Sequence, residues 1–182
     1  MSAILIQAKD GRQYNLRLLE ASDSEAFGEF LQTLSPATTR RFGPHPLTPQ
    51  HATILCQVLK QDSAQRWVIE DKGIIAGYFI LEHNISEHEA KRYSAQGVSL
   101  VSPLDVIFAP CIADAYQNLG LASAAIRPLM QQLKQQGARS MVLMGGTQAT
   151  NQRARHFYQA CGFVEYGRFN TELENIDMRA IL

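Results

Sequence analysis

The chain has 182 residues, 46% of them hydrophobic, with 17 basic and 17 acidic side chains. This length and composition are typical of a single globular domain, here residues 1–182, and exclude an intrinsically disordered chain. The formal net charge of zero provides no overall attraction to nucleic acid or to an anionic membrane, so neither is an expected partner.

The N-terminal residues predict a hairpin followed by a helix. Lys9-Asp10-Gly11 is an Asp-Gly turn between two segments, 4–8 and 14–19, in which apolar residues alternate with polar ones. Ser22-Asp23-Ser24-Glu25 has the Ser-x-x-Glu form of a capping box, and an apolar pattern with helical spacing follows it. We therefore expect the first helix to begin there.

A loop and a second helix come next. Pro36 and Gly43-Pro44-His45-Pro46 interrupt the helical pattern. The loop between them contains Arg40 and Arg41, which either bind an acidic substrate or are solvated surface side chains. Thr48-Pro49 then predicts a helix start, because Thr is a favoured cap and Pro is favoured at the first helical position.

The middle of the chain predicts a second hairpin and then a polar connection. Segments 66–70 and 74–81 flank Asp71-Lys72-Gly73, which is a turn signal. Residues 83–96 are polar and charged and show no clear apolar face. That segment is expected to be a surface connection or a short helix, placed where it could cover a substrate cleft.

A buried strand with a proline inside it precedes a long predicted helix. Residues 104–113 are mostly apolar, and Pro110 cannot donate a ladder hydrogen bond, so we expect a bulge or a loss of pairing there. The helix begins at about residue 119 and ends at Gly137. Pro128 lies inside it and should kink the helix or loosen one turn.

The C-terminal residues complete the predicted sheet. Residues 140–144 form a short apolar segment typical of a strand, and Asn151 is a suitable cap for a following helix. Segments 163–169 and 175–182 predict two more strands. The order of elements, without an internal repeat or a linker, indicates one domain of mixed α/β type.

The most informative segment is Gln117-Asn118-Leu119-Gly120-Leu121-Ala122, which joins the strand 104–113 to its helix through a turn of small residues. The first N–H groups of a helix have no partner within the helix, and the helix dipole is positive at this end. Such a turn favours anion binding, and a diphosphate would fit there.

A second motif follows the turn at a plausible spacing: Asn151, Ala154, Phe157-Tyr158 and Gly162-Phe163. With the turn, it resembles the GNAT superfamily of acyl-CoA-dependent N-acyltransferases, whose turn reads Arg/Gln-x-x-Gly-x-Gly/Ala. Ala122 stands at the last position of that turn, a substitution that the family tolerates. The resemblance is firm over about residues 104–169.

The resemblance implies an α/β fold with a central mixed, mostly antiparallel sheet flanked by helices. Its two central strands, here 104–113 and 140–144, would splay apart and admit the pantetheine arm of acetyl-CoA. No metal is expected. The cofactor-binding residues implied by the resemblance are Cys111, Ile112, Ala113, Gln117, Asn118, Leu119, Gly120, Leu121, Ala122, Ser123, Asn151 and Tyr158.

The same resemblance assigns catalytic roles. Tyr158 would protonate the departing thiolate, because a phenol with a pKa of about 10 matches the basicity of a thiolate. The base that takes the proton of the amine is open between Asp105, near the start of the central strand, and Glu82, at the end of the preceding one. Either could act directly or through water, or the amine could lose its proton to solvent. Cys111 is the rival nucleophile, but no paired histidine is evident.

The acceptor amine and the oligomeric state, monomer or homodimer, are not predicted by the sequence. Rival interpretations are a non-catalytic acyl-CoA-binding or sensing module and a nucleotide-binding enzyme. Cys56, Cys111 and Cys161 are widely spaced, which fits reduced thiols in a cytoplasmic protein. Neither a signal peptide nor an apolar membrane-spanning segment is evident in the sequence.

Overall fold

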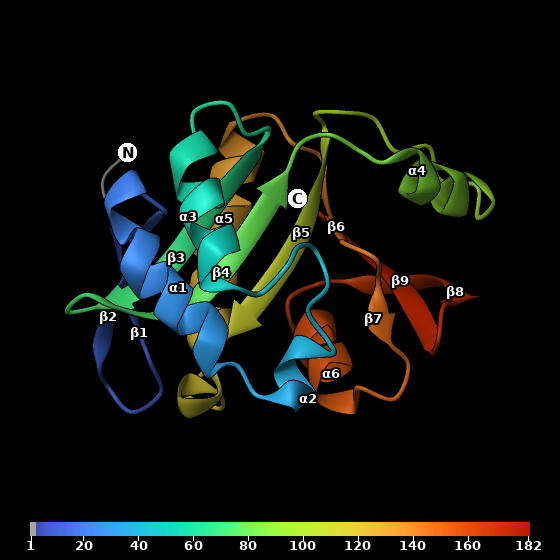
Figure 1. Ribbon diagram of the computed structural model, residues 1–182. Coiled ribbons are helices and arrows are strands. Elements are labelled where there is room, and N and C mark those ends of the chain that lie inside the picture. Colours follow the sequence, from blue (N-terminus) through green and yellow to red (C-terminus); the bar gives the residue numbers. More distant parts are fainter. Residues whose placement is uncertain (1–2) are drawn as a thin grey trace. The chain divides into compact units, whose positions relative to one another are not determined.

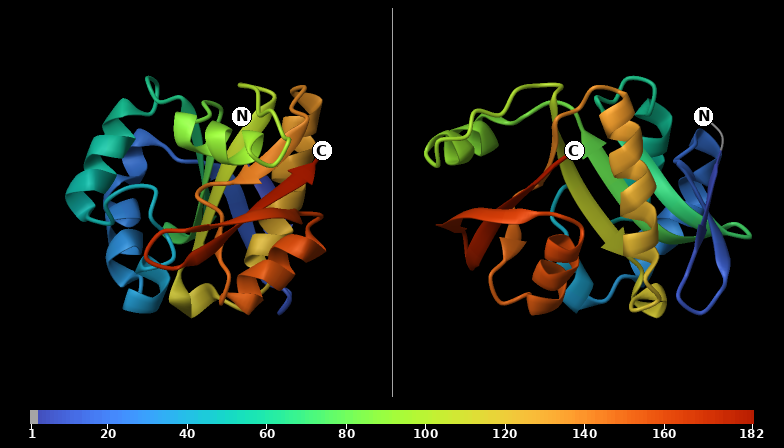
Figure 2. Two further views of the ribbon diagram at one scale, coloured as in Figure 1. Left: turned by 90° about the vertical axis from the view of Figure 1, so that its right-hand side faces the viewer. Right: turned by 180° about the vertical axis from the view of Figure 1, so that it is seen from behind.

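The computed structural model describes residues 3–182, which form two compact units (Figures 1 and 2). The first unit contains the chain up to Leu81 and the segment Ala109–Ala125. The second contains Glu82–Phe108 and Ile126–Leu182. β5 (Asp105–Ile112) and α5 (Leu121–Gln135) each contain residues of both units, and the predicted cofactor turn, residues 117–122, lies in the first unit.

Four consecutive strands form the sheet of the first unit. They are β1 (Ile4–Gln7), β2 (Gln13–Leu18), β3 (Ala64–Asp71) and β4 (Ile74–Glu82). β1 pairs antiparallel with β2, β2 pairs antiparallel with β3, and β4 follows β3 in the strand order. The turns at Gly11 and at Lys72 and Gly73 have positive φ angles. Both predicted hairpins are therefore confirmed.

Three helices belong to the first unit. They are α1 (Ser24–Thr33), α2 (Pro36–Thr39) and α3 (Pro49–Val58). α1 packs on the sheet through Phe27 and Phe30, whose rings lie 4.7 and 6.4 Å from the Tyr78 ring of β4 between centroids. Thr48 caps α3 as predicted, since its hydroxyl accepts a hydrogen bond from the His51 N–H at 3.2 Å.

Two local predictions in this unit are corrected. The expected capping box at Ser22 and Glu25 is not the one that forms; instead, the Asp23 carboxylate accepts the Glu20 N–H at 2.8 Å before α1. The side chain of Asp23 also pairs with Arg17. The expected loop after Pro36 begins with the short helix α2, because the Ser35 hydroxyl caps it.

The second unit is built on β5 (Asp105–Ile112), β6 (Ser140–Leu143), β7 (Thr147–Gln148), β8 (Val164–Asn170) and β9 (Glu174–Ile181). The first half of β5 pairs in parallel with β6, from Asp105 opposite Ser140 to Phe108 opposite Leu143. β9 pairs antiparallel with β6, β7 and β8. The expected α/β class, with a mixed and mostly antiparallel sheet, is confirmed; β7 is an addition.

The helices of the remaining chain are α4 (Glu87–Ser94), α5 (Leu121–Gln135) and α6 (Gln152–Ala160). α4 occupies the segment 83–96 and buries Tyr93 completely against Ile107 and Val142. The polar segment is thus a short helix with one buried anchor. α5 continues from its first to its last residue with Pro128 inside it.

Within residues 3–182, no helix has the length and apolar character that crossing a membrane requires. The same part of the chain holds no group of three or more His, Cys, Asp and Glu side chains placed to bind a metal ion. Cys56, Cys111 and Cys161 are free thiols, as predicted.

Candidate functional site

The turn before α5 has the backbone geometry of an anion site. Asn118 and Gly120 have φ angles of 66° and 75°, a left-handed conformation that most residues avoid. Alternating backbone handedness makes successive N–H groups converge on one point. The Ala124 N–H donates to the Gly120 carbonyl at 3.0 Å, so the three preceding N–H groups, at 121–123, have no acceptor within the helix.

Two side chains brace this turn from inside the first unit. The Gln117 amide donates to the Ile112 carbonyl and to the Thr38 hydroxyl, both at 3.2 Å. The Asp114 carboxylate accepts the Ser35 N–H at 2.8 Å and the Thr38 hydroxyl at 2.8 Å. Burial alone would raise the pKa of Asp114, but these hydrogen bonds outweigh it and the pKa is lowered. The charged carboxylate therefore fastens α2 to the turn.

The end of β5 offers a ligand one N–H group, not three. The Ala113 N–H donates to the Ala76 carbonyl at 3.0 Å, so it is already occupied. The Phe108 carbonyl accepts the Met144 N–H on the β6 side of the strand. Because backbone groups alternate along a strand, Pro110 and Ile112 face the same side as Phe108, whereas Cys111 faces β4. Pro110 has no N–H, which leaves that of Ile112.

Cys111 has the properties of a buried structural thiol. Its side chain is 5% exposed, and desolvation raises its pKa to about 12. The thiolate is the nucleophilic form of cysteine, so this thiol is inert near neutral pH. The geometry argues against the rival in which Cys111 carries an acyl group.

Tyr158 lies on α6 in the second unit and is 8% exposed. Its ring packs between those of Phe157 and Phe163, at 5.0 and 5.4 Å between centroids. The Tyr158 carbonyl accepts the Phe163 N–H at 3.0 Å, which holds the end of the helix. Asn151 caps the start, its side chain accepting the Ala154 N–H at 3.3 Å. Residues of the motif thus cap the start of α6 and hold its end in place.

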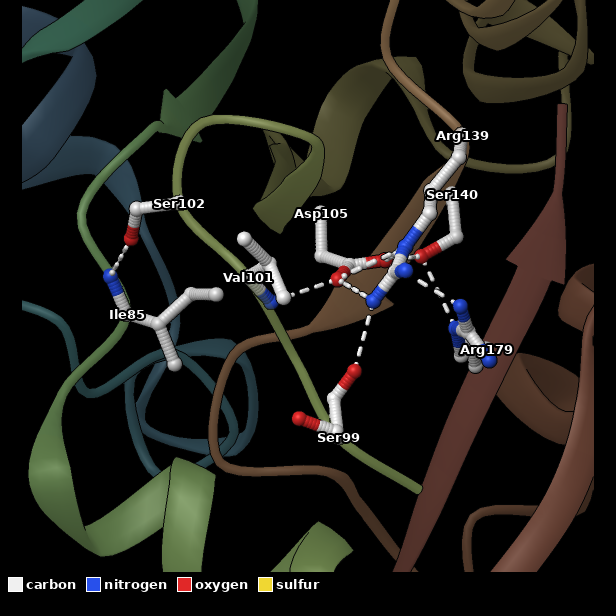
Figure 3. Close-up of polar contacts among 8 residues, drawn as sticks. All are labelled: Ile85, Ser99, Val101, Ser102, Asp105, Arg139, Ser140 and Arg179. Carbon is white, nitrogen blue, oxygen red and sulfur yellow. Dashed lines mark hydrogen bonds and ion pairs between the residues drawn. The ribbon is translucent and has the colours of Figure 1, made fainter.

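Asp105 is committed to a buried ionic cluster (Figure 3). The Arg139 Nη2 donates to its carboxylate at 2.6 Å, the Arg179 Nη2 at 3.1 Å and the Val101 N–H at 2.7 Å; the Ser140 hydroxyl donates as well. Burial would raise the pKa of Asp105, but the hydrogen bonds from Arg139 and Ser140 prevail and lower it. A carboxylate held in its ionised form has little affinity for a proton, which argues against Asp105 as the base.

The same cluster orders the segment that leads into β5. Arg139 also donates to the Ser99 carbonyl at 2.6 Å, and the Ser102 hydroxyl accepts the Ile85 N–H at 3.1 Å (Figure 3). Glu82, the last residue of β4, lies outside this cluster. Its carboxylate accepts the Asn84 N–H at 2.7 Å.

Sequence reasoning missed one residue beside the cofactor turn. The Lys9 N–H donates to the Leu119 carbonyl at 2.8 Å, which places the β1–β2 hairpin against the turn. No local pattern could indicate this contact, because the two residues are joined only by the tertiary fold.

Comparisons with known proteins bear on the family and the fold of this chain. Residues 27–163 match the family model described as Acetyltransferase (GNAT) family. The GNAT domain of PAT from S. lividans is 14% identical, with a TM-score of 0.76 over 99% of this chain and 97% of that chain. A comparison with curated proteins finds no match.

Two further solved structures have the same fold. Ribosomal-protein-S5-alanine acetyltransferase from Vibrio fischeri is 16% identical, with a TM-score of 0.74 over 100% of this chain and 97% of that one. AAC(6')-Ib in complex with paromomycin and acetyl-CoA is 19% identical, with a TM-score of 0.70 over 91% of this chain and 92% of that one. At these identities the likeness establishes the fold.

Proposed function

Because the chain belongs to the GNAT acetyltransferase family, we propose that it moves the acetyl group of acetyl-CoA to a primary amine of a small molecule, peptide or protein. The observation that carries the proposal is the turn before α5. Gly120 at a φ of 75° and the first-turn N–H groups of the helix form a site suited to a diphosphate.

The backbone donors fit the cofactor in two places. The diphosphate would accept hydrogen bonds from the N–H groups of residues 121–123, with the Ser123 hydroxyl as an added donor. The pantetheine arm, which is rich in amides, would donate a hydrogen bond to the Pro110 carbonyl, where β5 extends beyond the last residue of β6. Asn118, Leu119 and Gly120 shape this site through their backbone.

The reaction is a direct transfer in a ternary complex. The neutral amine attacks the thioester carbonyl carbon, the new C–N bond forms and the C–S bond breaks. The Ile112 N–H polarises the carbonyl oxygen as negative charge develops on it. Tyr158 donates its hydroxyl proton to the departing thiolate, a transfer for which a phenol is a suitable general acid.

The proton of the amine goes to Glu82, directly or through one water molecule. Asp105 is not assigned this role, because two guanidinium groups and a serine hydroxyl already occupy its carboxylate. Glu82 ends β4, and its carboxylate accepts the Asn84 N–H at 2.7 Å.

The test combines binding with turnover. Acetyl-CoA should raise the melting temperature, and release of the CoA thiol should depend on the amine supplied. The amine panel should include paromomycin and a peptide beginning with alanine, because the names of similar structures contain these groups. Stabilisation without thiol release for any amine would favour a non-catalytic acyl-CoA-binding module. Absence of stabilisation would overturn the proposal.

A further inference from the structure

The N-terminal hairpin is docked on the cofactor turn by its main chain and by a tyrosine. The Lys9 N–H donates to the Leu119 carbonyl at 2.8 Å. Tyr14, opposite Ile6 in the hairpin, lies edge-on against Tyr116, with ring centroids 6.2 Å apart. Neither contact uses the Lys9 side chain, so a substitution at Lys9 leaves the docking of the hairpin intact.

The Lys9 side chain lies across Gly120. A Cβ atom added at Gly120 would come within 2.8 Å of the Lys9 Cγ and 3.0 Å of its Cε. Only a glycine leaves this space open. The aliphatic stem therefore covers the turn, and the ammonium group beyond Cε lies at the same corner as the first N–H groups of α5.

The charged groups near Lys9 favour binding of an anion by its ammonium group. Gln117, at the motif position that the family fills with Arg or Gln, is neutral and directs its amide to Thr38 and Ile112. Asp10, next to Lys9, is paired with Arg12 at 2.7 Å. The carboxylate adjacent to Lys9 is thus already matched by another cation.

A second observation concerns a buried hydroxyl group of the same hairpin. The Tyr14 side chain is 1% exposed, and its hydroxyl has no hydrogen-bond partner within residues 3–182. Buried hydroxyl groups are normally hydrogen-bonded, and an exception calls for an explanation such as a bound ligand or water. Tyr14 contacts Tyr116, which immediately precedes the motif residue Gln117.

We propose that Lys9 binds the diphosphate of acetyl-CoA through its ammonium group and supplies the positive charge that Gln117 does not. This inference rests on the proposed function, because it assigns a residue to the same cofactor site. The stem of Lys9 over Gly120 holds the ammonium beside the helix N-terminus, where the backbone donors and a full charge act on the same phosphate oxygens.

The experiment measures the dissociation constants of CoA, dephospho-CoA and pantetheine by calorimetry. The variants are Lys9→Gln and Lys9→Arg, with Lys72→Gln as the control, since Lys72 is an exposed lysine in the other hairpin turn. Thermal unfolding of each variant checks that the fold is kept. Lys9→Gln should weaken CoA about five- to tenfold at low salt, and less as salt rises.

The two Lys9 variants and the three ligands distinguish binding of Lys9 to the diphosphate from binding to the 3′-phosphate and from no role in binding. Lys9→Arg should keep most of the affinity, dephospho-CoA should show the same loss as CoA, and pantetheine should show none. A loss seen with CoA but absent with dephospho-CoA would place Lys9 on the 3′-phosphate and overturn the assignment. Unchanged CoA binding in Lys9→Gln would overturn it while the proposed function stands. A native protein that binds no CoA would overturn both.

Discussion

Arg179 and Asp105 are 74 residues apart in the sequence, and their side chains meet at 3.1 Å in the interior of the second unit. The pair links β9 to the start of β5, and the Arg179 Nε also donates to the Ser140 hydroxyl on β6 at 2.8 Å. Three neighbouring strands are thereby joined through one carboxylate. The finding gives Asp105 a structural role and directs the search for a base to Glu82.

Replacing Asp105 with Asn should destabilise the fold, because it removes the buried negative charge that pairs with the buried Arg179 and with the partly exposed Arg139. We expect the free energy of unfolding to fall by about 3–5 kcal/mol, measured by urea denaturation. The acetyl-CoA affinity and the pH profile of the remaining folded enzyme should be unchanged. A stable Asp105→Asn variant that lost the acidic limb of its pH profile, where a general base becomes protonated, would restore the base role.

The matched control for that variant is the exposed ion pair between Arg168 and Glu174. Its atoms are 2.8 Å apart, but both side chains are about half exposed. Arg168→Gln should therefore lower the free energy of unfolding by less than about 1 kcal/mol. An equal loss in the two variants would mean that burial of the Asp105 cluster is not the cause.

Replacing Tyr158 with Phe should slow acetyl transfer about 10²-fold or more while leaving the acetyl-CoA affinity nearly unchanged. The substitution removes only the hydroxyl that protonates the thiolate, and the ring stays packed between Phe157 and Phe163. Thiol release and calorimetry measure the two effects. Tyr166→Phe, on β8, is the control and should keep its turnover. Full turnover in Tyr158→Phe would remove the acid assignment.

Replacing Gly120 with Glu should abolish acetyl-CoA binding, because the new side chain would displace the Lys9 stem, 2.8 Å from the added Cβ, and would put a negative charge at the turn proposed to bind the diphosphate. Gly137→Glu is a matched control, because Gly137 also has a positive φ angle, and a Cβ there would meet no heavy atom within 4 Å. The control carries the same kind of backbone strain away from the turn. Retained affinity in a folded Gly120→Glu variant would count against the site.

The burial of His45 predicts that the free energy of unfolding of the first unit falls at acidic pH. Its Nδ1 lies 2.8 Å from the Pro46 carbonyl, an acceptor, so Nδ1 carries the hydrogen and Nε2 accepts from the Tyr78 hydroxyl at 3.3 Å. Burial, with Arg66 and His51 nearby, lowers the pKa of His45 from 6.5 to about 4. The imidazole is therefore neutral in the folded protein.

The sign of the pH effect follows from this difference in pKa. Between about pH 6.5 and pH 4 the unfolded chain binds more protons at His45 than the folded one does, so the free energy of unfolding falls as the pH falls through that window. Allowing for partial solvent access, His45 should account for roughly 2 kcal/mol. Urea denaturation of His45→Gln should show a shallower loss, whereas His88→Gln, at an exposed site, should follow the native protein.

Several elements could be predicted because their signals are local. The Thr48 and Asn151 caps, the two hairpin turns and the start of α5 each depend on residues within a few positions of one another. The predicted capping box is two residues too late: the box forms between Glu20 and Asp23, and Asp23, which also pairs with Arg17, makes no side-chain hydrogen bond to the start of α1. The polar segment 83–96 leaves a surface connection and a short helix open, and the structure has the short helix α4, which buries Glu89 and Tyr93.

The sequence by itself determined the cofactor turn and the helix that carries Tyr158, since backbone handedness and helix capping are set by neighbouring residues. Only the tertiary structure showed that Asp105 forms a buried ionic cluster. Its partners are far away in the sequence: Arg139 directly precedes β6, and Arg179 lies on β9. The tertiary structure also brought Lys9 to Gly120. A carboxylate or an ammonium group has the same local sequence signal in a salt bridge as in a binding site; only the charges folded around it distinguish the two.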